Sequence, residues 1–331
     1  MKKAVWLFEV CLFIILSIPL AILPFKWSMK AGELLGLLVF YLWGSRRRIA
    51  IENIKESLLK SQESNPPESP HTPLWKRDNP PQSPFIKGGL EGDFKGGHGG
   101  INYSAEGIAR ETFKNLGRSL VEIIKIYYGY GEKIISSVDI EGIENFDQAK
   151  SKGKGILFLT GHCGNWELMA IATSVKLGDA AIVARPINNP YVNKFIENVR
   201  QKYGNRVIYK QKALKPIIQI LKNNGSVGIL IDQSVIPDEG YVIDFLGRGA
   251  WTTKMPALIA RKTGAAVLPV FIHRTDGGHR IKIYPEVELS KNGDIESAVL
   301  ADTKKFSHFI EEYIRAHPSE WLWIHRRWKR V

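Results

Sequence analysis

Short apolar runs recur along the second half of the chain and alternate with stretches of helical periodicity. The runs that predict strands are GILFLT (155–160), AAIVA (180–184), RVIY (206–209), SVGILID (226–232), AVLPVFI (266–272) and the alternating IKIYPEVEL (281–289). The helix-like stretches lie near 165–177, 190–203, 213–223 and 254–264, with a closing helix over 295–316. Strands that alternate with helices of this length predict an α/β fold with a mixed, mostly parallel sheet flanked by helices.

The N-terminus carries a different pattern, an apolar run over residues 4–25 that follows Lys2-Lys3 and contains one charge, Glu9. As a helix it reaches about 33 Å, roughly one hydrocarbon thickness. A signal peptide begins in the same way, but no small-residue cleavage site closes this run. We therefore expect an uncleaved membrane anchor, and the alternative is a buried helix of a soluble protein. Whether the segment spans the bilayer or lies in its interface stays open.

A second apolar stretch, residues 34–43, is too short to span a membrane and is followed by Arg46-Arg47-Arg48. This combination predicts an interfacial segment whose arginines meet lipid phosphates.

Residues 61–104 differ from the rest in composition, because they contain seven of the 17 prolines and seven glycines. Such a segment cannot bury enough apolar surface to order itself and reads as a flexible insertion. Helical spacing on both sides of it predicts a loop between two helices of one domain. The expected organisation is an anchor over 1–30 and one domain over 31–331, interrupted by the insertion at 61–104.

The net charge and its distribution along the chain favour some classes of binding partner over others. The chain has 46 Lys and Arg against 33 Asp and Glu, a net +13. Residues 1–50 hold a net +5 and residues 315–331 a net +4, and both windows are rich in large apolar side chains. Basic, apolar ends favour a membrane surface over nucleic acid. Two cysteines form no disulfide framework, and no set of Cys and His residues has the spacing of a zinc site.

Candidate chemistry lies where the strand 155–160 runs into Gly161-His162-Cys163-Gly164-Asn165-Trp166-Glu167, before a helix. In α/β sheets, residues that handle ligands gather at such carboxyl ends of strands. With His162 in the turn and Glu167 in the first helical turn, the carboxylate can hold one imidazole nitrogen and leave the other free as a base. The alternatives are a capping histidine without a catalytic role and, with less support, a nucleophilic Cys163 thiol.

The octapeptide GHCGNWEL resembles the His-x4-Asp/Glu block of glycerolipid-type acyltransferases. Its Asn-Trp-Glu form resembles the lipid A biosynthesis late (lauroyl/myristoyl) acyltransferases. Further agreement follows in chain order at Ala184-Arg185-Pro186 with Asn188-Asn189-Pro190, Arg200 before Gly204, Gly228 to Asp232-Gln233, Phe245-Leu246-Gly247 with Ala250 and Thr252, Ala265 with Pro269-Val270, and HPSEWLWIHRRWK (317–329). The C-terminal Trp/Arg signature is the most specific of these, and the resemblance covers nearly the whole chain outside 61–104.

This resemblance implies transfer of a fatty acyl chain from acyl carrier protein to a hydroxyl, that of an already attached acyl chain, on a lipid A precursor. It implies no metal and no cofactor beyond the acyl donor. The implied catalytic residues are His162 as base and Glu167 as its orienter. The implied substrate-binding or charge-stabilising residues are Arg200, Asp232, Arg185, Gln233 and Asn165.

The implied partners are acyl carrier protein, a lipid A precursor glycolipid and the anionic surface of the cell inner membrane, with the catalytic domain on its cytoplasmic face and no nucleic acid. One alternative is a related membrane acyltransferase with another glycolipid acceptor. A remote one is a non-catalytic protein that binds lipid or nucleic acid. The C-terminal Trp321, Trp323 and Trp328 allow two interpretations, contact with the membrane interface or packing on the core.

Overall fold

The computed structural model describes residues 2–59, 104–291, 293–329 and 331. The expected insertion at 61–104 lies outside the described residues except for Ser104, whose hydroxyl accepts a hydrogen bond from the Gly107 N–H and caps the following helix. The division into an anchor and one interrupted domain stays a prediction.

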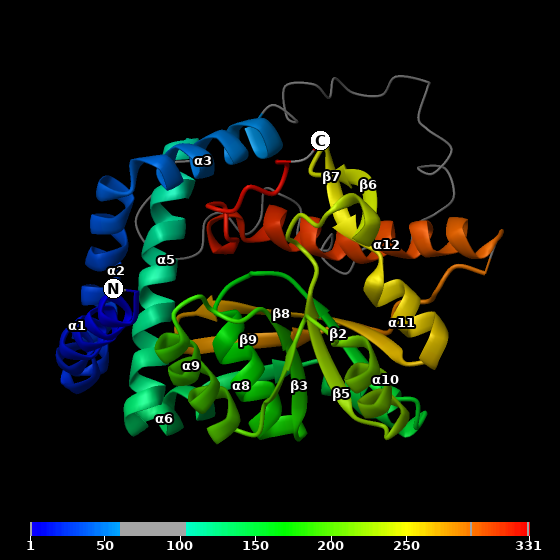
Figure 1. Cartoon of the computed structure of the whole chain (residues 1–331), viewed down its shortest axis with the longest axis horizontal. Coiled ribbons are helices and arrows are strands. Elements are labelled where there is room, and N and C mark those ends of the chain that lie inside the picture. Colours follow the sequence, from blue (N-terminus) through cyan, green and yellow to red (C-terminus); the bar gives the residue numbers. More distant parts are fainter. Residues whose placement is uncertain (1, 60–103, 292, 330) are drawn as a thin grey trace.

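A seven-stranded sheet forms the centre of the molecule, with strand order β1–β9–β8–β2–β5–β3–β4 (Figure 1). The strands are β1 (Val138–Glu141), β2 (Ile156–Thr160), β3 (Ala180–Ala184), β4 (Arg206–Tyr209), β5 (Ser226–Leu230), β8 (Ala266–Thr275) and β9 (Gly278–Ile283). Neighbours run parallel except β8 and β9. The expected α/β class with a mixed, mostly parallel sheet is confirmed.

Helices cover both faces of this sheet, so all five residues of β2 are buried. One face packs against α6 (Gly131–Ser136), α7 (Ile143–Ser151), α8 (Trp166–Leu177) and α9 (Pro190–Lys202). The other packs against α10 (Leu214–Lys222), α11 (Met255–Thr263) and α12 (Ile295–Ala316). Short turns of helix complete the described part, at η1 (Lys55–Leu59), η3 (Ile126–Tyr130), η4 (Pro237–Glu239) and η5 (Pro318–Glu320).

Four of the strands depart from the expectation. The hairpin of β6 (Gly240–Phe245) and β7 (Arg248–Thr253) and the edge strand β1 were not expected. Strand β9 begins at Gly278 and ends at Ile283, so the expected strand over 281–289 is wrong beyond residue 283. The hairpin crosses from β5 toward α11 and leaves the central sheet unextended.

The N-terminal helices α1 (Lys2–Ile22) and α2 (Phe25–Leu42) lie beside α5 (Ala105–Lys125) at the left of Figure 1. Residues Lys3–Ile22 form a helix long and apolar enough to cross a membrane, by length and composition, and only 11% of its most apolar window is buried. Phe8, Ile15 and Ile22 are each more than 60% exposed. This exposure is contrary to the alternative of a helix buried in a soluble core.

One stripe of α1 nevertheless contacts the body of the protein. Asn189 donates a hydrogen bond of 2.9 Å to Glu9, the single charge of the apolar run, and Phe13 packs edge-on against Phe195. At the other end of α1 the Lys125 ammonium donates to the Ala21 and Leu23 carbonyl oxygens, at 2.9 and 2.7 Å, where the helix dipole favours a cation. The helix is therefore fixed to the body along its length.

Glycines let α2 approach α5 backbone to backbone. A Cβ atom added at Gly36 would lie 2.1 Å from the Phe113 carbonyl oxygen, and one at Gly117 would lie 2.0 Å from the Gly32 carbonyl oxygen. The expected short interfacial segment 34–43 is thus the second half of an 18-residue helix that packs on α5. Its opposite face leaves Leu34, Leu38 and Leu42 exposed.

Candidate active site

The turn between β2 and α8 is built around two glycines that have no room for a side chain. A Cβ atom at Gly161 would lie 3.2 Å from the Asp232 carboxyl carbon. Gly164 has a φ of +55°, and a Cβ there would lie 2.2 Å from the Ile272 carbonyl oxygen. His162 stands between them and is brought against the residue that follows the neighbouring strand β5.

Asp232 holds both the backbone and the ring of His162. The Nδ1 atom of His162 lies 2.8 Å from Asp232 Oδ1, and the His162 backbone N–H donates to Asp232 Oδ2 at 2.9 Å. The Trp321 indole N–H donates to the same Oδ2 atom at 2.8 Å. These contacts fix a carboxylate that is 3% exposed.

The two charges of this pair shift each other's pKa. Burial acts to raise the pKa of the Asp232 carboxyl, but the charge of His162 and the hydrogen bonds hold it well below its usual range. Burial acts to lower the pKa of His162, but the charge and hydrogen bond of Asp232, with the charge of Glu167, raise it above its ordinary value. Asp232 is therefore ionised and favours a proton on Nδ1 of His162.

Glu167 does not make the hydrogen bond to His162 that the sequence suggested. Its carboxylate accepts two hydrogen bonds from the Arg200 guanidinium instead, at 2.9 Å from Nε and 2.5 Å from Nη2. The first turn of α8 directs the Glu167 side chain toward α9, which carries Arg200. Asp232, and not Glu167, makes the contact to Nδ1 in this structure, and the role of Glu167 in catalysis stays a prediction.

The second imidazole nitrogen contacts Gln233 and not a charged group. Gln233 Nε2 lies 3.2 Å from His162 Nε2, and the Trp166 ring stands edge-on to the imidazole with centroids 5.2 Å apart. With a proton on Nδ1, Nε2 carries a lone pair that accepts from the Gln233 amide. The His162 side chain is 19% exposed, so a substrate hydroxyl can reach this nitrogen by displacing that amide.

The C-terminal segment closes one side of the site. The Leu322 N–H donates to the His162 carbonyl oxygen at 3.1 Å, and the Gly164 N–H donates to the Glu320 carbonyl oxygen at 2.8 Å. Trp321, Trp323 and Trp328 are at most 9% exposed. Packing on the core is confirmed for these tryptophans, and contact of these rings with the membrane interface is wrong. Arg46, the first of the three consecutive arginines, contacts the same C-terminal segment because its guanidinium donates to the Ile324 carbonyl oxygen.

Three other predicted residues are placed differently. Asn165 is 3% exposed and uses its amide on Glu122 and its oxygen on the Leu168 N–H, so it caps α8 and does not line a substrate cleft. Cys163 is 1% exposed and burial raises the pKa of its thiol well above the ordinary value, which disfavours the thiolate nucleophile. Arg185 is exposed after β3.

Sequence reasoning missed a buried ion pair behind the turn. Glu122 of α5 is fully buried, and Arg274 of β8 donates to it at 2.9 Å from Nη2, with Asn165 at 2.8 Å. The available signal was a carboxylate between the buried Val121 and Ile124, on the apolar face of an amphipathic helix.

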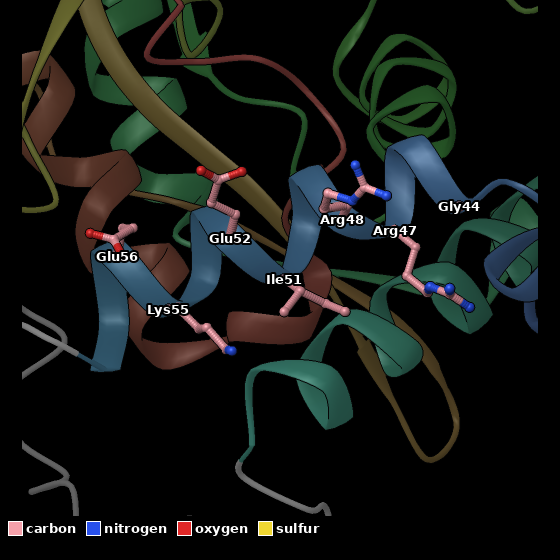
Figure 2. Close-up of a pocket in the computed structure, with 7 residues that line it drawn as sticks. All are labelled: Gly44, Arg47, Arg48, Ile51, Glu52, Lys55 and Glu56. Carbon is pink, nitrogen blue, oxygen red and sulfur yellow. The ribbon is translucent and has the colours of Figure 1, made fainter.

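A hollow of about 500 Å³ lies along α3 (Gly44–Ile54) and the turn after it. Figure 2 shows that its lining carries two arginines toward one end and two glutamates with a lysine toward the other; the lining residues are Gly44, Arg47, Arg48, Ile51, Glu52, Lys55 and Glu56. None of the predicted site residues lines it. Among the described residues no three His, Cys, Asp or Glu side chains are grouped to hold a metal ion.

Comparison with known proteins identifies the family. The model of the family described as bacterial lipid A biosynthesis acyltransferase matches residues 102–330. The chain belongs to this family. The resemblance drawn from the His162 block and the C-terminal signature is thereby confirmed, and the protein is an acyltransferase.

The names of three relatives of this acyltransferase give two kinds of acceptor, lipid A and phosphatidylinositol mannoside. It is 26% identical over 227 residues to the lipid A biosynthesis palmitoleoyltransferase of Escherichia coli (strain K12), covering 68% of this chain and 72% of that one. It is 21% identical over 221 residues to the lipid A biosynthesis myristoyltransferase of the same strain, covering 66% and 67%. It is also 23% identical over 222 residues to the phosphatidylinositol mannoside acyltransferase of Mycobacterium tuberculosis (strain ATCC 25618 / H37Rv), covering 66% and 69%. The chain is therefore a lipid A or related glycolipid acyltransferase.

Proposed function

We propose that this acyltransferase moves a fatty acyl chain from acyl carrier protein to a hydroxyl on a lipid A precursor, with His162 as general base. The observation that carries the proposal is the His162–Asp232 pair, which leaves Nε2 unprotonated beside Gln233, on a side chain that is 19% exposed. A hydroxyl is a poor nucleophile near neutral pH, so a positioned base is needed as it attacks a thioester.

In the proposed reaction, Nε2 of His162 takes the proton of the acceptor hydroxyl while the oxygen bonds to the thioester carbonyl carbon. The carbon–sulfur bond then breaks, and the protonated imidazole returns the proton to the leaving thiolate. Asp232 stabilises the transient imidazolium because its ionised carboxylate contacts Nδ1 at 2.8 Å. Arg200 and Glu167 form an ion pair beside this centre, and we assign them to holding α9 against α8.

The test uses the purified full chain in detergent. The donor is acyl carrier protein loaded with a radiolabelled acyl chain, and the acceptor is a lipid A precursor. His162→Ala and Asp232→Asn should each lower transfer by about 10²–10⁴-fold, the usual contribution of acid–base groups. Cys163→Ser is the matched control, because Cys163 is a buried neighbour of His162 that takes no part in the proposed reaction. This variant should keep most of the wild-type transfer activity. Wild-type transfer by His162→Ala would refute the base assignment.

The alternative acceptor is a mannosylated phosphatidylinositol, as the name of the mycobacterial relatives suggests. Mass spectrometry of lipid A from a deletion strain, with and without this gene, separates the two. A lipid A acyl count that is the same in both strains would overturn the lipid A acceptor.

The proposed location is the cytoplasmic face of the inner membrane, with α1 in the bilayer, since the acyl donor is cytoplasmic. An enzymatic reporter that works only in the cytoplasm, fused after Val331, should be active. An inactive reporter at this position, together with an active reporter of a kind that works only in the periplasm, would reverse the orientation.

A further inference from the structure

A segment of the α/β body carries a larger net positive charge than either chain end. Residues 185–222 contain nine Lys and Arg and a single acid, Glu197, a net +8. The windows 1–50 and 315–331 hold +5 and +4. The expectation that most of the excess charge marks the two apolar ends is therefore incomplete, because this segment carries α9, β4 and α10 at one edge of the sheet.

The strand order determines on which side of the sheet this positive charge lies. Parallel strands end at the same side of the sheet, so the chain after β3 and β4 lies on the side where His162 follows β2 and Asp232 follows β5. Four exposed cations lie at these strand ends or at the starts of the helices that follow. They are Arg185 after β3, Lys194 near the start of α9, Lys212 after β4, and Lys215 at the start of α10. We call these four the rim cations.

The rim cations take no part in holding the described fold together. None of the four forms an ion pair with a carboxylate in the described part of the chain, whereas Arg200 and Lys210 of the same segment pair with Glu167 and Glu239. Lys212 has a φ of +68°, a left-handed conformation that is strained for a residue with a Cβ. Free charge on a strained loop beside an active site points to a binding partner.

An apolar hollow lies within this charge. Its volume is about 390 Å³, and Lys212, Leu214, Lys215 and Ile218 line it. Leu214 is 44% exposed. Cations around an apolar hollow fit an acidic protein surface that presents an apolar side chain, since charge steers the encounter and the apolar contact holds it.

The position of the hollow favours a protein over a lipid surface. Helices α1 and α2, which carry exposed apolar side chains, lie at the left of Figure 1, whereas α10 lies at the right, against β5 and α11. A membrane held by α1 and α2 would leave the start of α10 accessible from the aqueous side.

We propose that the rim cations and Leu214 form the docking surface for the acidic carrier protein that delivers the acyl thioester. This inference rests on the proposed function, in which the donor is acyl carrier protein. Docking at this side of the sheet places the carrier next to the strand ends that hold His162 and Asp232, so its flexible arm has a short path to the base.

The test compares two charge-reversed pairs on the same strand and helix. Lys212→Glu with Lys215→Glu reverses the rim, and Arg206→Glu with Lys222→Glu makes the same change in net charge at the opposite ends of β4 and α10. All four positions are exposed. Transfer is measured on the full chain in detergent with two acyl donors. One is acyl carrier protein loaded with an acyl chain, and the other is acyl-pantetheine, a thioester without the carrier.

The rim pair should raise KM for acyl carrier protein at least tenfold and flatten its salt dependence, with kcat and the acyl-pantetheine rate unchanged. The control pair should shift KM less than twofold. Equal KM values for the two pairs, or an equal loss with acyl-pantetheine, would overturn the docking surface.

Two further measurements separate this inference from the proposed function. Direct binding of holo carrier protein to the rim pair should weaken by the same factor as KM. If the rim pair loses binding to anionic vesicles and keeps binding to the carrier, the surface is a membrane contact and the inference fails. A wild-type protein that uses acyl-pantetheine and not acyl carrier protein refutes the proposed donor, and the docking surface with it.

Discussion

Replacing Glu122 with glutamine tests how much the buried ion pair behind the catalytic turn contributes to stability. Glu122 is fully buried, while the Arg274 side chain that pairs with it is 23% exposed. Burial acts to raise the pKa of Glu122, but the charge and hydrogen bonds of Arg274 lower it below the ordinary value. The carboxylate is thus ionised, and Glu122→Gln keeps its shape while removing its charge.

The expected cost follows from the contacts that change. Arg274 makes two charge-assisted hydrogen bonds to Glu122, each worth about 1.5–3 kcal/mol. Breaking a buried pair by removing one partner typically costs about 3–5 kcal/mol, because the remaining charge is left uncompensated. We expect Glu122→Gln to lower the free energy of unfolding by about 3–5 kcal/mol, a large share of the roughly 5–15 kcal/mol of a typical domain.

The assay is denaturant unfolding in detergent, followed by tryptophan fluorescence, with Arg274→Met and the double variant completing a cycle. The double variant should lose less than the sum of the single variants, since it leaves no charge unpaired. Glu288→Gln, which breaks an exposed pair with Lys291, should have no measurable effect. A Glu122→Gln loss below about 1 kcal/mol, or strict additivity in the cycle, would refute the reasoning.

Three further predictions concern the site and the helix packing. The raised pKa of His162 places the acid limb of the pH–rate profile above the ordinary pKa of histidine, because only the neutral ring is a base. The residual activity of Asp232→Asn should have its acid limb at lower pH. An acid limb at the same pH in this variant would contradict the pairing. Gly117→Ala should lower the free energy of unfolding by about 1–3 kcal/mol in thermal or denaturant melts, because its Cβ meets the α2 backbone, whereas Gly44→Ala, with open space around it, should not. Trp321→Phe keeps a ring but removes the indole donor to Asp232, so kcat should fall several-fold while KM is kept, and an unchanged kcat would argue against that contact.

The pH dependence of stability has the opposite sign to that of activity. Because the folded pKa of His162 is raised, its pairing with Asp232 stabilises the fold fully below the unfolded value, about 6.5. That contribution is lost as pH rises through the folded pKa, where the base becomes active.

Local pattern predicted the strands that are short apolar runs between helix-like stretches. The runs at 180–184 and 206–209 match β3 and β4 residue for residue, because β-branched and aromatic side chains favour a strand at this length even where burial is only partial. The hairpin 240–253 was missed because charged and glycine residues interrupt its alternation.

The candidate site was predicted by residue type more than by contact. His162 and Asp232 were both chosen, yet their pairing depends on β2 and β5 being neighbours, and a separation of 70 positions in the sequence follows no spacing rule. His162 and Glu167 are close in sequence, but the turn and helix geometry directs Glu167 to Arg200. Trp321 was considered for the membrane because its indole, read alone, suits an interface as well as a buried carboxylate.

The attachment of α1 to α9 and α5 bears on how a truncated, more soluble form would behave. Deleting α1 removes Glu9 from Asn189, the residue that caps α9, and takes away the Ala21 carbonyl, one of the two acceptors of the Lys125 ammonium. Helix α9 also carries Arg200, the partner of Glu167. Loss of activity after such a deletion would therefore reflect a disturbed catalytic body as much as absence from the bilayer. Substituting only the outward apolar residues of α1 keeps its inner stripe intact and separates the two effects.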